Sequence, residues 1–118
     1  MSVFSTTAKN DMLDALTCDE IQLHDGDPGA AGTANRVGDT DGVEAAVFAA
    51  ASSGSRALNA QVDFSNLSAL QSITWISVWE SGVQFQGKAQ ITSGDVAANA
   101  AGEWSATTAT ALNLDDPA

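Results

Sequence analysis

The sequence has almost none of the residues that crosslink a small domain. Its 118 residues include one cysteine, Cys18, so an intrachain disulfide cannot form and a zinc site with four thiolate ligands is excluded. Cys18 follows the end of a predicted helix, where the helix dipole raises a thiol pKa, so we expect an inert and partly buried thiol. The fold must therefore be stable without disulfide crosslinks within the chain.

Large apolar side chains are also scarce. There is no tyrosine, only three tryptophans and four phenylalanines are present, and much of the 44% hydrophobic content is alanine. A chain of this length fits one domain, which we predict to span residues 1–118. A core this thin gains stability when it packs against copies of itself, so we expect a homo-oligomer.

Basic residues are few. Four Lys and Arg stand against fifteen Asp and Glu, which gives a formal net charge of -11. Such a surface repels nucleic-acid phosphates, and it lacks the basic clusters that bind anionic membranes. Residues Met1 to Asn10 contain no basic segment followed by an apolar one, and no stretch approaches the roughly 18 apolar residues of a membrane span. We therefore expect no nucleic-acid or membrane partner, and a protein kept inside the producing cell until that cell is broken open.

The N-terminal segment has the spacing of one amphipathic helix. Apolar residues recur at helical intervals from Phe4 through Ala8 and Met12 to Leu16, and polar residues fill the gaps. We predict a short helix from about Ser5 to Leu16, within an N-terminal unit of residues 1–17. Its single apolar stripe must dock on the domain's own sheet or on a neighbouring subunit.

Residues 19–114 show the alternating pattern of strands separated by turns rich in Gly, Ser and Asp. This predicts a mostly β fold, an antiparallel β-sandwich or small barrel of about six strands, preceded by the short N-terminal α-helix. A long surface loop is expected over residues 30–42. The predicted strands are Ile21–His24, Val43–Ala49, Leu58–Ser65, Ile73–Trp79, Val83–Lys88 and Glu103–Leu114.

The predicted strand Ile73–Trp79 is apolar on both faces, and Glu80-Ser81-Gly82 turns it into a hairpin with the next strand. A strand of this kind is central in a sandwich or lies where another subunit packs. An aromatic platform for sugars or single-stranded nucleic acid is the alternative, and the negative charge argues against nucleic acid. The residues predicted to form an assembly interface are Phe4, Met12, Leu16, Trp75, Trp79 and Phe85.

The segment His24-Asp25-Gly26-Asp27 is the one place where the single imidazole lies beside carboxylates. In such a turn the aspartates are expected to accept local backbone hydrogen bonds while His24 closes a strand, so no catalytic residue is predicted. Calcium is an alternative use of the acidic loops, although their spacing lacks the later bidentate Glu of the helix-loop-helix calcium site. We predict no cofactor or metal, and the residues of the calcium alternative are Asp25, Asp27, Asp39 and Asp41.

The order of these segments resembles a family of small phage structural proteins usually labelled tail-fibre-like or hypothetical virion proteins. In that family a strand ending Leu-His-Thr precedes an Asp-Pro-Gly turn and a Gly-Ala-Asn, whereas this chain has Asp25 where Thr is frequent. The more acidic loop around Asp39-Thr40-Asp41 is a second departure. The matching segments cover most of the chain and are Asn10–Leu16, Ile21–Asn35, Val43–Phe48, Ala57–Phe64 and Ile73–Trp79 with its hairpin.

This resemblance implies a virion component with no known active site, so no functional residue is carried over. The chain lacks the heptads, collagen-like repeats and β-helix repeats of fibre shafts. We therefore expect a non-enzymatic capsid decoration or cement protein, a homotrimer that binds the major capsid protein between subunits and resides in the virion after assembly in the host cytoplasm. A small tail or tail-fibre adaptor protein is one alternative, and a carbohydrate-binding receptor module is another.

Overall fold

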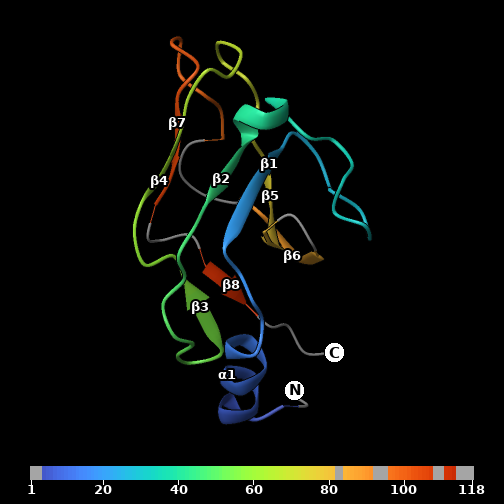
Figure 1. The fold of residues 1–118 in the computed structure, drawn as a ribbon, viewed down its shortest axis with the longest axis vertical. Coiled ribbons are helices and arrows are strands. Elements are labelled where there is room, and N and C mark those ends of the chain that lie inside the picture. Colours follow the sequence, from blue (N-terminus) through green and yellow to red (C-terminus); the bar gives the residue numbers. More distant parts are fainter. Residues whose placement is uncertain (1–3, 82–83, 92–95, 108–110, 114–118) are drawn as a thin grey trace.

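The computed structural model describes residues 4–81, 84–91, 96–107 and 111–113, and it confirms a mostly β chain with one short N-terminal helix (Figure 1). The molecule is elongated, with principal extents of 43 × 28 × 26 Å. The elements are α1 (Thr6–Asp14), β1 (Glu20–His24), the 3-10 helix η1 (Asp39–Gly42), β2 (Val43–Ala45), β3 (Ser55–Ala57), β4 (Val62–Phe64), β5 (Trp75–Glu80), β6 (Gln84–Gln90), β7 (Trp104–Ala106) and β8 (Ala111–Asn113).

A four-stranded antiparallel sheet in the order β2-β1-β5-β6 forms the body of the fold. Its inner face carries Ile21 and Leu23 from β1 and Ile76 and Val78 from β5, and each of these side chains is at most 1% exposed. The predicted strands over Ile21–His24 and Ile73–Trp79 are therefore present, with ends shifted by one or two residues. These four side chains belong to the hydrophobic core cluster of the described residues.

The predicted hairpin between β5 and β6 is confirmed, and it contains an irregularity that places its aromatic residues. Val78 pairs with Gly87, but Trp79 pairs with Phe85, so the register shifts between Val78 and Trp79. A β-bulge of this kind adds a residue to one strand and re-aims its side chains. Val83, which the sequence assigned to the returning strand, lies outside the described residues.

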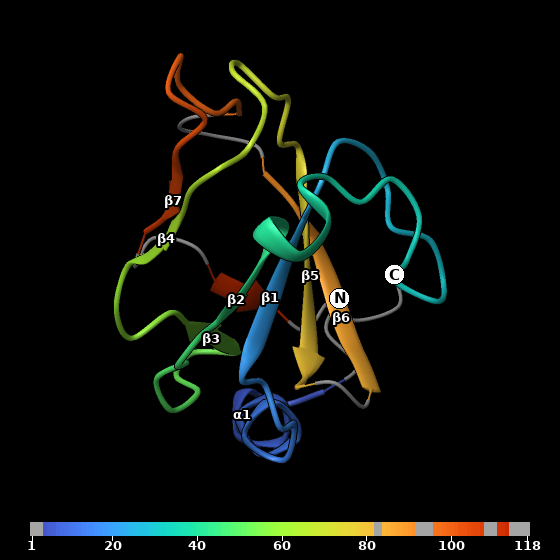
Figure 2. The same ribbon diagram turned by 45° about the horizontal axis from the view of Figure 1, so that its top comes forward.

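Two shorter antiparallel pairs complete the β structure, β4 with β7 and β3 with β8. Figures 1 and 2 both place the β4–β7 pair beside the four-stranded sheet and α1 at the opposite end of the molecule from the loops that follow β4 and precede β7. Across the β4–β7 pair Phe64 faces Trp104, with ring centroids 5.9 Å apart. These two rings supply much of the aromatic content of the core.

Three predicted strands are shorter than expected because the chain changes partners along them. Residues Val43 to Ala45 pair with β1, whereas Phe48 pairs with Leu58 in an isolated bridge, so the predicted strands Val43–Ala49 and Leu58–Ser65 are each interrupted. The predicted strand Glu103–Leu114 is described as β7 and β8, while residues 108–110 and Leu114 lie outside the described part. The long loop over residues 30–42 ends in η1.

The helix begins where the sequence predicts and packs through a different face. The Ser5 hydroxyl oxygen caps α1 by accepting a hydrogen bond from the Ala8 backbone N–H at 3.1 Å. Leu13 is the buried residue of α1, at 3% exposed, whereas Phe4 and Met12 of the predicted stripe are 38% and 36% exposed. None of the described helices is long and apolar enough to cross a bilayer.

Polar contacts explain which face of α1 turns inward. The Arg56 Nη1 donates to the carbonyl oxygens of Leu13 and Leu16 at 3.1 and 2.9 Å, and its Nε donates to Ala49 O. The Asp14 carboxylate accepts from the Ala51 backbone N–H at 2.8 Å. Because these bonds join α1 to β3 and its flanks, the stripe of Phe4 and Met12 is directed away from β3.

Cys18 is buried next to this junction, at 7% exposed. Burial raises the pKa of its thiol, and the nearby Arg56 charge opposes that effect only in part. The thiol therefore has the partly shielded, protonated character that the sequence suggests.

Candidate functional site

The outer face of the four-stranded sheet brings together three of the residues predicted to form an interface. Trp79 on β5 lies against Phe85 on β6, with ring centroids 5.4 Å apart and planes inclined by 54°. The Lys88 Nζ lies 5.6 Å from the centroid of the Trp75 ring, within the range of a cation–π contact. Trp75, Trp79 and Phe85 are half-buried. We call this surface the aromatic face.

The loop after β1 covers part of the aromatic face. Gly32 has a φ of +75°, and a Cβ atom added to it would lie 2.3 Å from a carbon of the Phe85 ring. The Lys88 Nζ donates to Asp27 Oδ1 at 2.6 Å, and the Gly29 backbone N–H donates to the same oxygen at 2.9 Å. A loop of the same chain therefore covers part of the aromatic face, which the sequence predicted to contact a neighbouring subunit.

A directed chain of hydrogen bonds lies beneath this loop. His24 and Ser77 are both 0% exposed, and His24 Nε2 is 2.7 Å from Ser77 Oγ. His24 Nδ1 is 2.7 Å from the carbonyl oxygen of Ala34, and because a carbonyl only accepts, Nδ1 carries the proton. Ser77 then donates to Nε2 and accepts from the Trp79 indole N–H at 2.8 Å.

This arrangement defines what His24 can do. Neither Asp25 nor Asp27 forms a hydrogen bond with its ring, so the imidazole is oriented by a backbone carbonyl and a serine. Ser77 has a base and an N–H donor beside its hydroxyl, which are components of a nucleophilic site. Both residues are sealed from solvent, however, so in this conformation the chain fixes the loop to the sheet. The sequence signal for this pair was Ser77, a polar residue inside an apolar strand.

The stability of the protein is expected to fall as the pH is lowered from about 7.5 to 5. Burial lowers the pKa of His24 below its ordinary 6.5, and the Arg36 charge lowers it further, against the opposing Ala34 hydrogen bond and Asp25 charge. Below pH 6.5 the unfolded chain binds a proton that folded His24 does not, so stability is lost at up to about 1.4 kcal/mol per pH unit. Urea unfolding across this range measures the slope. A slope that stays the same in His24→Gln would contradict the assignment to His24.

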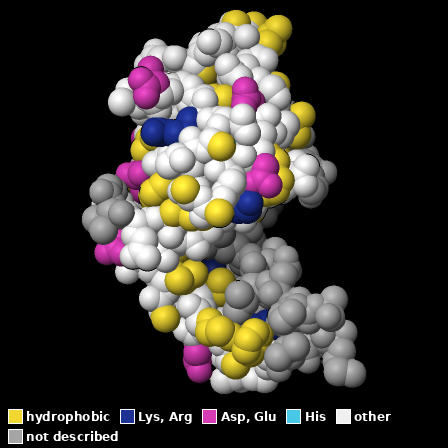
Figure 3. All heavy atoms as spheres, turned by 90° about the vertical axis from the view of Figure 1, so that its right-hand side faces the viewer, with side chains coloured by type: hydrophobic (Ala, Val, Ile, Leu, Met, Phe, Trp, Pro, Cys, Tyr) yellow, Lys and Arg dark blue, Asp and Glu magenta, His cyan; other side chains and the backbone are white. Residues whose placement is uncertain are grey.

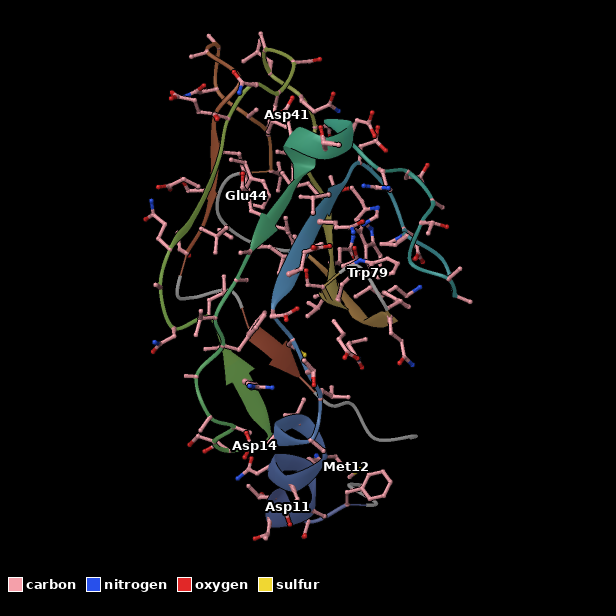
Figure 4. The ribbon with its side chains drawn as sticks, in the orientation of Figure 1. Asp11, Met12, Asp14, Asp41, Glu44 and Trp79 are labelled. Carbon is pink, nitrogen blue, oxygen red and sulfur yellow. The ribbon has the colours of Figure 1, made fainter. Side chains whose placement is uncertain are left out.

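The acidic loops do not converge on a cation site. Asp27 accepts from Lys88, and this bond holds the pKa of the Asp27 carboxyl below its usual value, with help from the Gly29 N–H. Asp39 and Asp41 lie in η1, and Asp25 is exposed on the other loop (Figure 4 labels Asp41). Within the described ranges no three His, Cys, Asp or Glu side chains lie close enough to hold a metal ion.

The helix carries the other half of the predicted interface. Phe4 and Met12 are exposed, whereas Leu16 is half-buried and packs against the core. Figure 4 places Met12 at the lower end of the molecule and Trp79 on the sheet above it, so the helix and sheet residues of the predicted interface lie apart. Figure 3 shows hydrophobic side chains gathered at the height of α1 and over the middle of the molecule. We call the exposed pair Phe4 and Met12 the helix patch.

A groove of about 610 Å³ lies beside the β4–β7 pair, at the end of the molecule away from α1. Phe64 and Trp104 are among its lining residues, although their side chains are almost fully buried, at 1% and 7% exposed. Its walls carry carboxylate, amide and hydroxyl groups, among them Asp63, Asn99, Glu103 and Ser105. No local pattern in the sequence reveals this groove, because its walls come from paired segments that lie 42 residues apart at Asp63 and Ser105.

Comparison with known proteins gives no relative. No family model matches the chain, and no curated protein or solved structure matches it either. Evidence on function therefore comes from the residues and geometry of this chain.

Proposed function

We propose that this chain is a non-enzymatic virion structural protein that docks on a larger particle, as a capsid decoration or cement protein does. The observation that carries the proposal is the helix patch. Phe4 and Met12 are 38% and 36% exposed at one end of an elongated molecule, while the inward face of the same helix is fixed to β3. Two apolar side chains left partly exposed on the outward side of the helix give a partner a small apolar contact to cover.

Two further features support docking as the main role. The order of segments resembles small phage structural proteins, and the single imidazole, the usual base for a Ser or Cys nucleophile, is enclosed in the hydrogen-bond chain to Ser77 and Ala34. The partner is the major capsid protein or another virion protein, and three copies around a capsid three-fold axis would bring three helix patches to one site.

A tail or tail-fibre adaptor protein would use the same helix patch on a different partner. The sugar-binding alternative on the aromatic face is less favoured, since Lys88 lies over the Trp75 ring and Trp79 packs on Phe85, so each ring already has a partner within the chain. A chain that docks through α1 keeps its aromatic face covered in part by its own loop after β1.

Substitution of the helix patch is expected to abolish particle binding without unfolding the protein. The variant is Phe4→Gln with Met12→Gln, because glutamine has nearly the helix propensity of methionine and removes the apolar surface. The measurement is co-sedimentation of the intact chain with purified DNA-filled heads that lack tails, from the same infected culture. We expect at least a tenfold loss of bound protein, the loss that follows from about 1.4 kcal/mol of binding free energy.

Val47→Gln is the matched control, because Val47 is 64% exposed on a different part of the surface. It is expected to co-sediment as the unchanged protein does. Recovery of the protein only with purified tails would support the adaptor alternative. A stable monomer that joins neither heads nor tails would contradict docking altogether.

A further inference from the structure

We propose that the loop over residues 25–36 is a lid on the aromatic face, and that protonation of His24 opens this lid while the sheet stays folded. We call this loop the lid, and Figures 1 and 2 draw it in light blue to the right of β1. The lid lies apart from the helix patch, and its opening does not depend on the docking role.

The lid is a compact loop whose two ends are joined to each other. The Asp25 backbone N–H donates to Asn35 O at 3.0 Å. Next to this bond, His24 and Arg36 form an antiparallel bridge. Inside the loop, Asn35 Nδ2 donates to Asp27 O at 2.9 Å. A loop that is bonded internally and closed at its base can move as one body about that base.

The contacts between the lid and the sheet differ in strength. The ion pair between Lys88 and Asp27 joins side chains that are 34% and 55% exposed, and such a pair contributes little to stability. The Gly32 backbone lies against the Phe85 ring. The remaining attachment is the hydrogen bond from His24, a residue that is 0% exposed. Of these contacts, the one made by His24 changes when the pH falls through the range in which an imidazole titrates.

Protonation of His24 disturbs the hydrogen bonds on the sheet side of its ring. In the neutral ring Nδ1 donates to Ala34 O, and Nε2 accepts from the Ser77 hydroxyl. A proton on Nε2 makes this atom a donor, so Ser77 Oγ must accept from it and from the Trp79 indole N–H. The Ser77 hydroxyl proton then loses its acceptor. The imidazolium is also enclosed, and a buried charge is strongly disfavoured unless it is paired or hydrated.

The charged groups around His24 do not compensate for its burial. Burial lowers the pKa of His24 below its ordinary 6.5 more than the hydrogen bond to the lid raises it. Of the two nearby charges at the ends of the lid, Arg36 lowers this pKa and Asp25 raises it. On β6, Lys88 is paired with Asp27 of the lid, and the groups of β5 that face the ring are uncharged. Movement of the lid therefore relieves the imidazolium by letting water reach it.

A rearrangement of Ser77 is the competing possibility. Gln22 faces Ser77 across β1 and β5, and its Oε1 is buried with no hydrogen-bond partner among the described residues. This oxygen could accept the displaced Ser77 proton while the lid stays closed. Such a rearrangement would satisfy the hydroxyl group but would leave the imidazolium enclosed, so opening of the lid is favoured.

The open form gains population as the pH falls. In the open form His24 is hydrated and has a pKa near 6.5, whereas the closed form keeps this pKa lower. Below pH 6.5 the open form therefore binds a proton that the closed form does not. The ratio of open to closed chains is expected to rise by up to about tenfold per pH unit in this range.

The test is fluorine NMR of the intact chain carrying fluorinated phenylalanine, from about pH 7.5 to about 5. Phe85 reports on the lid, and the buried Phe48 and Phe64, at 7% and 1% exposed, report on the core. We expect the Phe85 resonance to change with pH by the ratio given above, while the Phe48 and Phe64 resonances keep their native positions. Single Phe→Leu variants assign the resonances.

Two variants separate the lid from other causes of a pH effect. His24→Gln removes the titrating ring, so the response of Phe85 to pH should be lost. Gly32→Ala should hold the lid open at neutral pH, because its Cβ would lie 2.3 Å from the Phe85 ring at a φ of +75°. Its Phe85 resonance should then match that of the unchanged protein at low pH. Glu44→Gln, at an exposed position on β2, is the control and should titrate as the unchanged protein does.

Three results would overturn the inference. The first is a Phe85 resonance that changes only together with those of Phe48 and Phe64, since this would mean global unfolding. The second is an equal response of Phe85 to pH in His24→Gln. The third is uptake of a proton by His24, followed by its own ring resonances, while Phe85 keeps its position, as the rearrangement of Ser77 would give. These measurements need no particle, so they leave the docking role to its own test.

Discussion

Replacement of Phe64 with alanine is expected to lower the free energy of unfolding by about 3–5 kcal/mol. Phe64 is 1% exposed and packs against Trp104 across the β4–β7 pair. The sequence has four phenylalanines and three tryptophans, so few other large side chains can move into the space left behind. Since small domains are stable by only about 5–15 kcal/mol, this loss would leave the protein close to unfolding.

Urea unfolding followed by tryptophan fluorescence measures this change, and Val47→Ala is the control. Val47 is 64% exposed, so its truncation should shift stability by no more than about 0.5 kcal/mol. Equal effects of the two substitutions would show that Phe64 is not part of a cooperative core.

The elements with their own local signal, an apolar and polar alternation or a turn sequence, were predicted correctly. The strand over Ile21–His24 and the hairpin after Trp79 are present because each contains its own periodicity and turn signal. Pairings between distant segments were not predictable in the same way. Arg56 lies in β3, which pairs with β8 more than fifty residues later, and no pattern near Arg56 announces that pairing.

The helix shows that periodicity can predict an element without deciding which of its apolar residues pack inside the chain. Helical spacing places both Met12 and Leu13 near an apolar stripe, and hydrophobicity alone favoured the set with Phe4 and Met12. The side that packs was decided by the guanidinium of Arg56 and by the Asp14 carboxylate, which hold helix and β3 together. Polar partners that lie 37 to 43 residues away in sequence are invisible to a periodicity count.

Distance along the sequence also separates the contacts of the candidate site that the sequence predicts from those that it does not. Trp79 and Phe85 lie on neighbouring strands of one hairpin, so their contact follows from the turn between them. The bond between His24 and Ser77 joins residues 53 positions apart and depends on the register of β1 against β5. A loop that covers the aromatic face also depends on Gly32, whose role is visible only once Phe85 lies beside it.

A strong coupling is expected between the effects of substitutions at His24 and Ser77, and a double-mutant cycle measures it. His24→Leu leaves the Ser77 hydroxyl and the Ala34 carbonyl without their partner, and each buried orphan costs about 1–3 kcal/mol. Ser77→Ala leaves His24 Nε2 and the Trp79 indole N–H unpaired, with a loss of about 1–3 kcal/mol.

The double variant should be destabilised by less than the sum of the two single effects, because the second change removes a group that the first has already orphaned. A coupling of about 0.5–3 kcal/mol is expected from urea unfolding at neutral pH. Ser105→Ala is the control, since its hydroxyl bonds to the exposed Asp63 and its loss should cost less than about 1 kcal/mol. Additivity of the two changes would mean that the hydrogen bond between His24 and Ser77 does not fix the loop to the sheet.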